Sequence, residues 1–190
     1  TPINSICFLS EFKKMPKKIK LINCVGGGSS AYGFWSEFID YDKKQIELIG
    51  VEAGGPKSSK LHAAPLTNGA KLGILHGAAA YVCQNSEGQI NDTASISAGL
   101  DYPGVSPIHC FLKDTKRARY TSATDEAALN AYKLVTKLEK INPSLEPSHA
   151  FAEAIKIAPK LNKDTIIIVN SCGDAKKDRD ILKERLGKIN

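Results

Sequence analysis

Long hydrophobic runs are missing from this sequence. No apolar stretch approaches the roughly 20 residues that cross a bilayer, and the N-terminus lacks the charged-then-apolar layout of a secretion signal. The five cysteines are scattered and none is spaced as CxxC, which argues against a disulfide framework and against a zinc site. We therefore expect no membrane partner and a reducing compartment, the cytoplasm.

Short paired histidine spacings, which many metal sites use, are missing as well. We therefore expect structural or solvent-facing roles for His62, His76, His109 and His149. Of the cysteines, we expect all but Cys172 to be small buried apolar residues.

The chain has 190 residues with 42% hydrophobic content, enough to bury a substantial core. Its net charge of +6 and pI near 9.0 raise nucleic acid as a partner. Basic residues gather at 13–20 and 176–185, but the second stretch also contains acidic residues and neither is interleaved with aromatics. Because mixed signs at helical spacing are typical of exposed helices, we favour solvated faces and expect no nucleic-acid partner.

The hydrophobic pattern predicts an α/β fold, a parallel twisted sheet flanked by helices. Strand signals lie at 19–25, 46–51, 119–121 and 165–169, and helix signals at 29–39, 124–139, 147–161 and 177–186. Thr124 is expected to cap the second helix, and Glu146 to be the N-cap before Pro147 in the third, with Ile155 and Ala158 on its buried side. Residues 52–107 lack strong periodicity, so we expect site-building loops with short helices there.

Three consecutive glycines, Gly26 to Gly28, separate the first strand from the first helix. Such a run brings bare amide groups against an anion at the positive end of a helix, which suits a phosphate. Close backbone packing is the alternative reading of the same glycines. The run lacks the Lys-Ser/Thr of a P-loop and the spacing of GxGxxG, so ATP and NAD are disfavoured.

Five segments in order resemble motifs of the tryptophan synthase β chain family, whose members use pyridoxal 5'-phosphate (PLP). They are CVGGGSSA at 24–31, GVEAGG at 50–55, EGQI at 87–90, SISAGLDYP at 95–103 and LEPSHA at 145–150. The resemblance implies that residues 1–190 are a single C-terminal, cofactor-phosphate-binding portion of this two-domain PLP fold. The N-terminal half, which carries the lysine that binds the cofactor covalently in a motif like HKINN, is then absent.

The resemblance also implies roles for individual residues. Glu146 would stand beside the cofactor ring and assist proton movement, and Asp101 would hydrogen-bond the hydroxyl of the serine substrate. Plain structural roles, as an N-cap and as a turn residue, are their alternatives. The cofactor phosphate would be held by the main-chain amides of Gly26, Gly27, Gly28, Ser29 and Ser30. Carbonyls of Gly26, Tyr102 and Gly104 would hold a monovalent cation, Na⁺ or K⁺.

One segment departs from the family pattern. Where the family has NxSGRGDKD, residues 170–178 read NSCGDAKKD. Cys172 stands in the place of the serine that bonds the pyridine nitrogen, Ser171 points to the other side of the strand, and Asp174 replaces an arginine. A thiol is a weak partner for that nitrogen, so the tuning of the cofactor is expected to differ.

The leading hypothesis is a PLP-dependent lyase of tryptophan biosynthesis that condenses indole with L-serine to give L-tryptophan. Its partners in the complete enzyme would be the tryptophan synthase α chain and a second β chain. Without the lysine, the chain alone is expected to be inactive. The alternatives are a catalytically idle truncated binding module, or another fold type II PLP enzyme such as a cysteine synthase or dehydratase. The SISAGLDYP and LEPSHA segments favour the leading hypothesis over the other enzymes.

Overall fold

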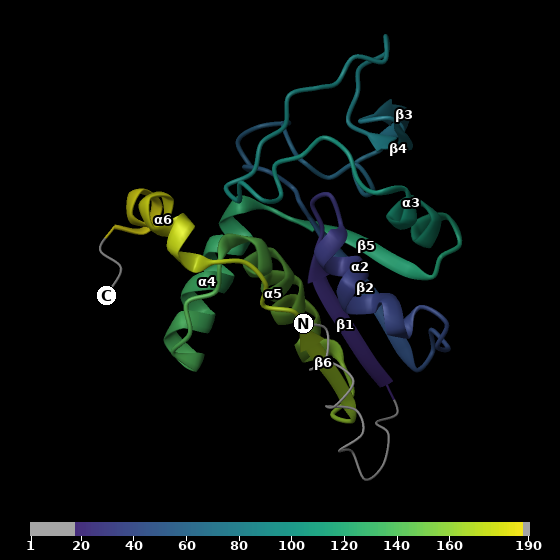
Figure 1. Cartoon of the computed structure of the whole chain (residues 1–190). Helices are drawn as coiled ribbons and strands as arrows, with labels where there is room; N and C mark the ends of the chain where they lie inside the picture. Colours follow the sequence, from purple (N-terminus) through teal and green to yellow (C-terminus); the bar gives the residue numbers. More distant parts are fainter. Residues whose placement is uncertain (1–17, 188–190) are drawn as a thin grey trace.

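The computed structural model describes residues 18–187, and its centre is a four-stranded parallel sheet in the order β5-β2-β1-β6 (Figure 1). The strands are β1 (Lys18–Cys24), β2 (Ile46–Ala53), β5 (Ala118–Ala123) and β6 (Thr165–Val169). All four coincide with predicted strands, and the sheet is flanked by helices as expected. Helix α2 (Ser29–Trp35) connects β1 to its parallel neighbour β2, so the strand, helix and strand signals at the start of the sequence form a βαβ unit.

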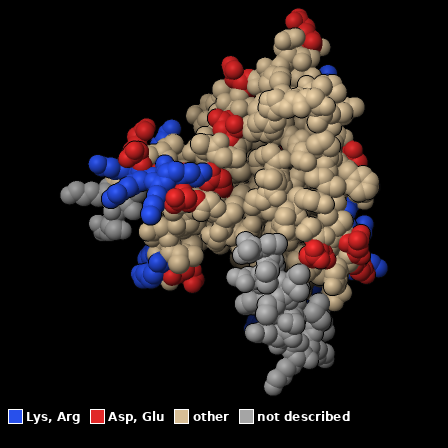
Figure 2. Space-filling view, in the orientation of Figure 1, with Lys and Arg blue, Asp and Glu red and all other residues tan. Residues whose placement is uncertain are grey.

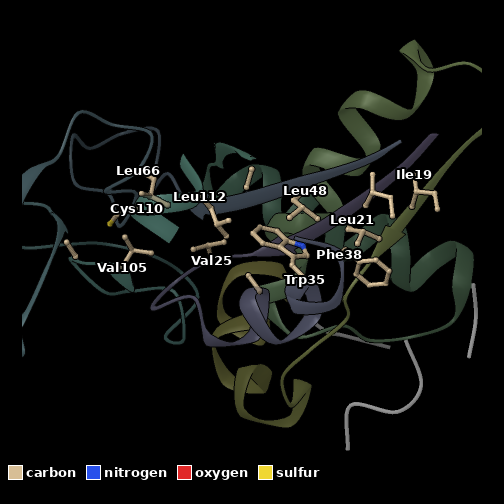
Figure 3. Packing of buried hydrophobic residues seen from close by; sticks show 14 residues of the cluster. Ile19, Leu21, Val25, Trp35, Phe38, Leu48, Leu66, Val105, Cys110 and Leu112 are labelled. Atoms are coloured by element: carbon tan, nitrogen blue, oxygen red, sulfur yellow. The ribbon is translucent and has the colours of Figure 1, made fainter. Parts of the chain in front are cut away.

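Alternating side chains give the sheet two buried faces. Ile19 and Leu21 of β1 pack with Trp35 of α2 and with Leu112 of α3 (Pro107–Asp114) on one face, as Figure 3 shows for this cluster. Ile22 and Cys24 of the same strand belong to the opposite cluster, with Ala150 of α5 (Leu145–Ile157). Helix α4 (Asp125–Glu139) packs against α5. The central strands are therefore covered on both sides, as a parallel sheet requires.

Helix α4 begins where the sequence predicts, because the side chain of Thr124 accepts a hydrogen bond from the Ala127 amide at 3.3 Å. Helix α2, by contrast, ends at Trp35 and continues as the 3₁₀ turn η1 (Ser36–Phe38), so the predicted single helix over 29–39 is interrupted. The last predicted helix is likewise divided, into η3 (Ala175–Asp178) and α6 (Arg179–Leu186).

Helix α5 corrects one prediction. Its N-cap is Ser144, not Glu146, because the amide of Leu145 donates to Asp178 Oδ2 at 2.7 Å and the helix starts two residues earlier than expected. It ends at Ile157 and is followed by the 3₁₀ turn η2 (Ala158–Lys160). Ile155 and Ala158 are exposed rather than buried, since the buried residues of the helix are 145–150 and Glu153.

The stretch 52–107 contains no helix between Glu52 and Ser106, so the expected short helices are wrong. Its two apolar runs form an antiparallel hairpin instead, β3 (Lys71–Leu75) with β4 (Ala78–Val82). His76 and Gly77 form its turn with φ of 51° and 77°, the left-handed geometry that two-residue hairpin turns need. The other residues of the stretch are loops, as predicted.

Charged groups of both signs mix on the surface around α6 (Figure 2). The first basic stretch behaves differently, because Lys20 is 6% exposed and forms an ion pair with Glu47 of β2 inside the fold. Lys13, Lys14 and Lys17 of that stretch lie outside the described residues. None of the helices in residues 18–187 combines the length and apolarity needed to cross a bilayer.

Candidate functional site

The site lies at the carboxyl ends of β1 and β6. From β1, the chain first adds β2 and β5 on one side of the sheet and then returns to add β6 on the other side. The direction in which strands are added therefore reverses between β1 and β6. In parallel α/β sheets, ligands bind in the crevice beyond such a reversal point. The glycine run follows β1 at this edge, and Cys172 follows β6.

The glycine run needs glycine for steric reasons at two positions. A Cβ on Gly26 would lie 2.5 Å from the carbonyl oxygen of Gly99, and Gly28 has φ of 99° with the His109 ring directly beside its Cα. Both positions therefore exclude a side chain. By contrast, a Cβ on Gly27 would meet nothing within 4 Å, and Gly27 is exposed.

His109 of α3 fixes the conformation of this run. Its Nε2 lies 2.7 Å from the carbonyl oxygen of Gly28 and its Nδ1 lies 2.8 Å from the hydroxyl of Tyr120 on β5. Since a carbonyl only accepts, Nε2 carries the proton and Nδ1 accepts from Tyr120. Burial lowers the pKa of His109, which keeps the ring neutral in this arrangement.

The carbonyls and the amides of the run differ in their partners. The carbonyl of Gly27 accepts from the Ser106 amide at 2.9 Å, and that of Gly28 accepts from His109 and from the Tyr32 amide. Within residues 18–187, the amides of residues 26–30 donate to no protein group. Donors without partners on an exposed loop at a helix start suit an anion.

Ser30 joins the ends of three elements. Its Oγ accepts from Nδ2 of Asn23 on β1 at 3.2 Å and from Nδ2 of Asn170, just after β6, at 3.3 Å. The backbone amide of Asn170 also donates to the carbonyl of Ile22 at 3.1 Å. These contacts hold the start of α2 against the crevice, while Ser29 stays exposed with its hydroxyl on the surface.

Cys172 and Cys24 meet across the crevice, with 3.6 Å between their sulfur atoms. The hydrogen bond from Cys24 lowers the pKa of Cys172 to about 6, with a smaller contribution from Ser30. The same contact and burial raise the pKa of Cys24 well above its usual value. Cys172 is therefore the thiolate of the pair at neutral pH. Ser171 beside it is exposed.

Glu146, in the first turn of α5, is 7% exposed. Its Oε1 accepts from the Gly99 amide at 3.1 Å and from Nζ of Lys177, while Oε2 is buried and has no partner among the described residues. Burial raises the pKa of Glu146, but the ammonium of Lys177 and the nearby hydroxyl of Ser144 lower it by more, so that the pKa lies at about 2. The carboxylate therefore stays ionised, and one of its oxygens is left for another donor.

Gly173 shapes the same corner of the site. It has φ of 86°, and a Cβ there would lie 2.5 Å from Ser144 Oγ and 3.3 Å from the unpaired Oε2 of Glu146. Ser144 Oγ donates to the carbonyl of Cys172 at 3.0 Å. The segment after β6 is thus tied to the start of α5, which brings Cys172 and Glu146 to one place.

The remaining predicted residues lie in the turn after SISAGL. Asp101 is exposed, and its amide donates to the carbonyl of Ser97 at 3.1 Å. The hydroxyl of Tyr102 lies 3.0 Å from Nδ1 of His76, and Gly104 forms a bridge with Val82 of β4. Gly26 contacts this turn at Gly99 and Leu100. In the described part of the chain, no three His, Cys, Asp or Glu side chains form a metal-binding group.

Three curated relatives, all named tryptophan synthase beta chain, match most of this sequence. The one from Rhodopseudomonas palustris (strain BisA53) is 48% identical over 167 residues, 88% of this chain and 41% of the relative. The one from Chromobacterium violaceum is 49% identical over 159 residues, which are 83% of this chain and 39% of the relative. The one from Fusobacterium nucleatum is 50% identical over 179 residues, which are 94% of this chain and 44% of the relative. Over these residues the chain is similar to tryptophan synthase β chains, with about half of its positions identical to each relative. No protein-family model matches the sequence.

The family resemblance drawn from the motifs is thereby confirmed. The chain spans about two fifths of the length of the tryptophan synthase β chains that it matches. In the structure, three of the motifs meet: the glycine run, the SISAGLDYP segment and the LEPSHA segment share contacts through Gly99. They lie far apart in the sequence, so their meeting supports a common site.

The contribution of two residues to the site was not predicted. Lys177 was assigned only to a charged helix, yet it forms the ion pair that keeps Glu146 ionised. The structural role expected for His109 is confirmed, but its position as the buried support of the glycine run was not predicted. Neither contact has a local signal, because Lys177 lies 31 residues from Glu146 and His109 lies 81 residues from Gly28.

Proposed function

We propose that this chain forms the cofactor-phosphate-binding part of a PLP-dependent lyase. The observation that carries the proposal is the run of amides at 26–30, which have no protein partner among residues 18–187, while the carbonyls of Gly27 and Gly28 accept hydrogen bonds from Ser106 and His109. The residues fit the group, since amides of this kind and the hydroxyl of Ser29 suit phosphate oxygens. We propose as well that the chain is one structural unit, because β1 pairs with β6.

The other site residues support a cofactor ring in the same crevice. When bound, PLP acts as an electron sink for carbanion chemistry at an amino acid. Cys172 supplies a thiolate next to the glycine run, where its sulfur can face the ring nitrogen, with Ser171 exposed beside it. The unpaired Oε2 of Glu146 is available to hold a proton beside the ring, and exposed Asp101 to hydrogen-bond a substrate hydroxyl.

We propose for the full-length protein the reaction in which indole replaces the hydroxyl of L-serine, giving L-tryptophan. The names of the relatives support it, as do the contacts among their shared motifs. Its partners are the tryptophan synthase α chain and a second β chain, and its compartment is the cytoplasm, where free thiols such as Cys24 persist. The carbonyls of Gly26, Tyr102 and Gly104 are the proposed ligands of Na⁺ or K⁺, since Gly26 contacts the turn that carries the other two.

Among residues 18–187, the lysine that contacts this site is Lys177, and it does not replace the one that the family uses. Burial lowers the pKa of Lys177, but its hydrogen bond with Glu146 raises it more, so this ammonium keeps its proton. A protonated amine is not a nucleophile. The 190-residue chain by itself is therefore proposed to bind the cofactor without turnover.

Binding of PLP to the purified chain, followed by equilibrium dialysis, tests the phosphate site. We expect PLP to bind and pyridoxal, which has no phosphate, to bind at least about tenfold more weakly. Gly28→Ala should weaken PLP binding, because alanine resists φ of 99° and its Cβ meets His109. Gly33→Ala in α2 is the matched control, since a Cβ there meets nothing within 4 Å. Equal affinity for PLP and pyridoxal would contradict the proposal.

A second experiment tests the reaction in the full-length protein. Glu146→Gln keeps the shape of the side chain and removes its charge, so we expect kcat for tryptophan formation from indole and L-serine to fall about 100-fold or more. PLP content, measured by absorbance, should stay unchanged. Tryptophan formation at the unmodified rate would favour a purely structural role for Glu146. Absence of any tryptophan from the unmodified protein would favour the idle binding module or another fold type II enzyme.

A further inference from the structure

Two thiols face each other at the carboxyl end of the sheet. Cys24 is the last residue of the central strand β1 and is 4% exposed, whereas Cys172 is half-buried in the segment after β6, and their sulfur atoms are 3.6 Å apart. The other described cysteines have no thiol neighbour: Cys83 lies 4.0 Å from His62 and Cys110 contacts the Tyr81 amide. This pair therefore differs from the rest in geometry.

The two thiols also differ from each other in their access to solvent. Cys24 is buried at the end of β1, whereas Cys172 is half-buried in a segment outside any helix or strand. Cys172 is thus the sulfur that a peroxide can reach, and Cys24 is a thiol in contact with it. Cys83, which is buried and has no thiol beside it, serves as an internal reference.

We propose that Cys24 and Cys172 form an oxidation site for hydroperoxides, with Cys172 as the reacting sulfur and Cys24 as the resolving one. The Cys172 thiolate attacks one oxygen of hydrogen peroxide, the O–O bond breaks, and the departing hydroxide takes a proton to become water. The Cys24 thiol then attacks the sulfenic sulfur of Cys172, and a second water leaves with the Cys24 proton. Two thiols and one peroxide give one disulfide and two waters.

The fold allows the bond to form. A disulfide needs the sulfurs about 2.05 Å apart, so they must approach by about 1.5 Å. Cys24 is held in the middle of the sheet, and the approach falls to Cys172, which is followed by Gly173 outside any helix or strand. The product would join the end of β1 to the segment after β6, beside Ser30 and the glycine run. The oxidation itself does not depend on the proposed cofactor chemistry.

Peptide mapping of the full chain tests the proposal. After treatment with one equivalent of hydrogen peroxide and alkylation of the remaining thiols, trypsin should release residues 21–43, with Cys24, linked to residues 164–176, with Cys172. The linked mass should be two hydrogens below the sum of the two peptides and should disappear on reduction. The peptide 72–113, which carries Cys83 and Cys110, should be modified at least about tenfold more slowly.

Two variants assign the roles. In Cys24→Ala, Cys172 should still react with peroxide but remain as sulfenic acid, trapped by dimedone. In Cys172→Ala, Cys24 should lose its reactivity, with circular dichroism confirming the fold of both variants. Two results in the chain without substitutions would overturn the proposal. One is oxidation of the 72–113 peptide as fast as that of the peptides with Cys24 and Cys172, and the other is a link from Cys172 to any cysteine other than Cys24.

Discussion

The ring of His109 connects the glycine run to the sheet. It bonds the carbonyl of Gly28 on one side and the hydroxyl of Tyr120 on the other, and it lies edge-on to Trp35 with 5.7 Å between ring centroids. Because both bonds are buried, either partner left alone would lose hydration without compensation. The shape of the proposed phosphate site therefore depends on a residue beneath it.

Replacing this ring tests that dependence. His109→Phe keeps the packing but leaves Gly28 O and the Tyr120 hydroxyl without their partner, so we expect a loss of about 2–4 kcal/mol in the free energy of unfolding by urea. Tyr120→Phe removes one of the two bonds and should cost about 1 kcal/mol. Similar losses for both variants would show that the bond to Gly28 contributes little.

Lys177 should control the ionisation of Glu146. The pKa of Glu146 lies at about 2 in the folded chain, below its ordinary value of 4.5, so the unfolded chain binds more protons between these values. Stability from this group is present above pH 4.5 and is lost as pH falls toward 2. Lys177→Met should raise the Glu146 pKa and flatten this part of the stability curve.

An NMR titration of the Glu146 carboxyl carbon checks the shift directly. Lys176→Met is the matched control, since this neighbour also carries a charge but bonds through its backbone, whose amide donates to Asp174 and whose carbonyl accepts from Arg179. If the pKa of Glu146 is the same in the two variants, the ion pair with Lys177 is not what lowers it.

At the scale of elements, the sequence predicts what short-range patterns determine. β6 is a continuous apolar run, β1 and β2 are rich in Ile, Leu and Val, and α4 has its cap and its apolar face within one segment. The β3–β4 hairpin was missed because its strands are short, rich in Gly and Ala, and carry exposed Leu72 and Ile74 in place of a buried face. The glycine run and Glu146 could be singled out from motifs, but the supports His109 and Lys177 could not.

The start of α5 shows how a distant residue moves a helix boundary. Asp178 accepts from the Leu145 amide, so Asp178→Ala should leave that amide unpaired and cost about 1–2 kcal/mol. Hydrogen exchange at the Leu145 amide should become faster. Asp180→Ala, at an exposed position of α6, should change neither the free energy of unfolding nor this exchange rate. Unchanged protection of Leu145 in Asp178→Ala would mean that Ser144 alone fixes the helix start.

At the scale of the molecule, the sheet is completed by its last strand in the chain. β6 supplies the second neighbour of β1, and both core clusters receive residues from it, Ile168 in one and Ile167 and Val169 in the other. A chain lacking residues 164–190 should therefore lose its cooperative thermal transition in circular dichroism. Removing residues 188–190 alone is the control and should leave the transition intact. Cooperative melting of the shorter chain would show that β6 is dispensable.

The pairing of Lys18 with Thr165 also has a consequence for the order of events on the ribosome. β1 is synthesised first among the described strands, yet one of its edges has no partner until β6 has emerged. Pairings that close such long loops form slowly, and an apolar strand with an open edge invites pairing with other chains meanwhile. Productive folding of this protein should therefore depend on chaperones that shield β1 during translation, more than its final stability would suggest.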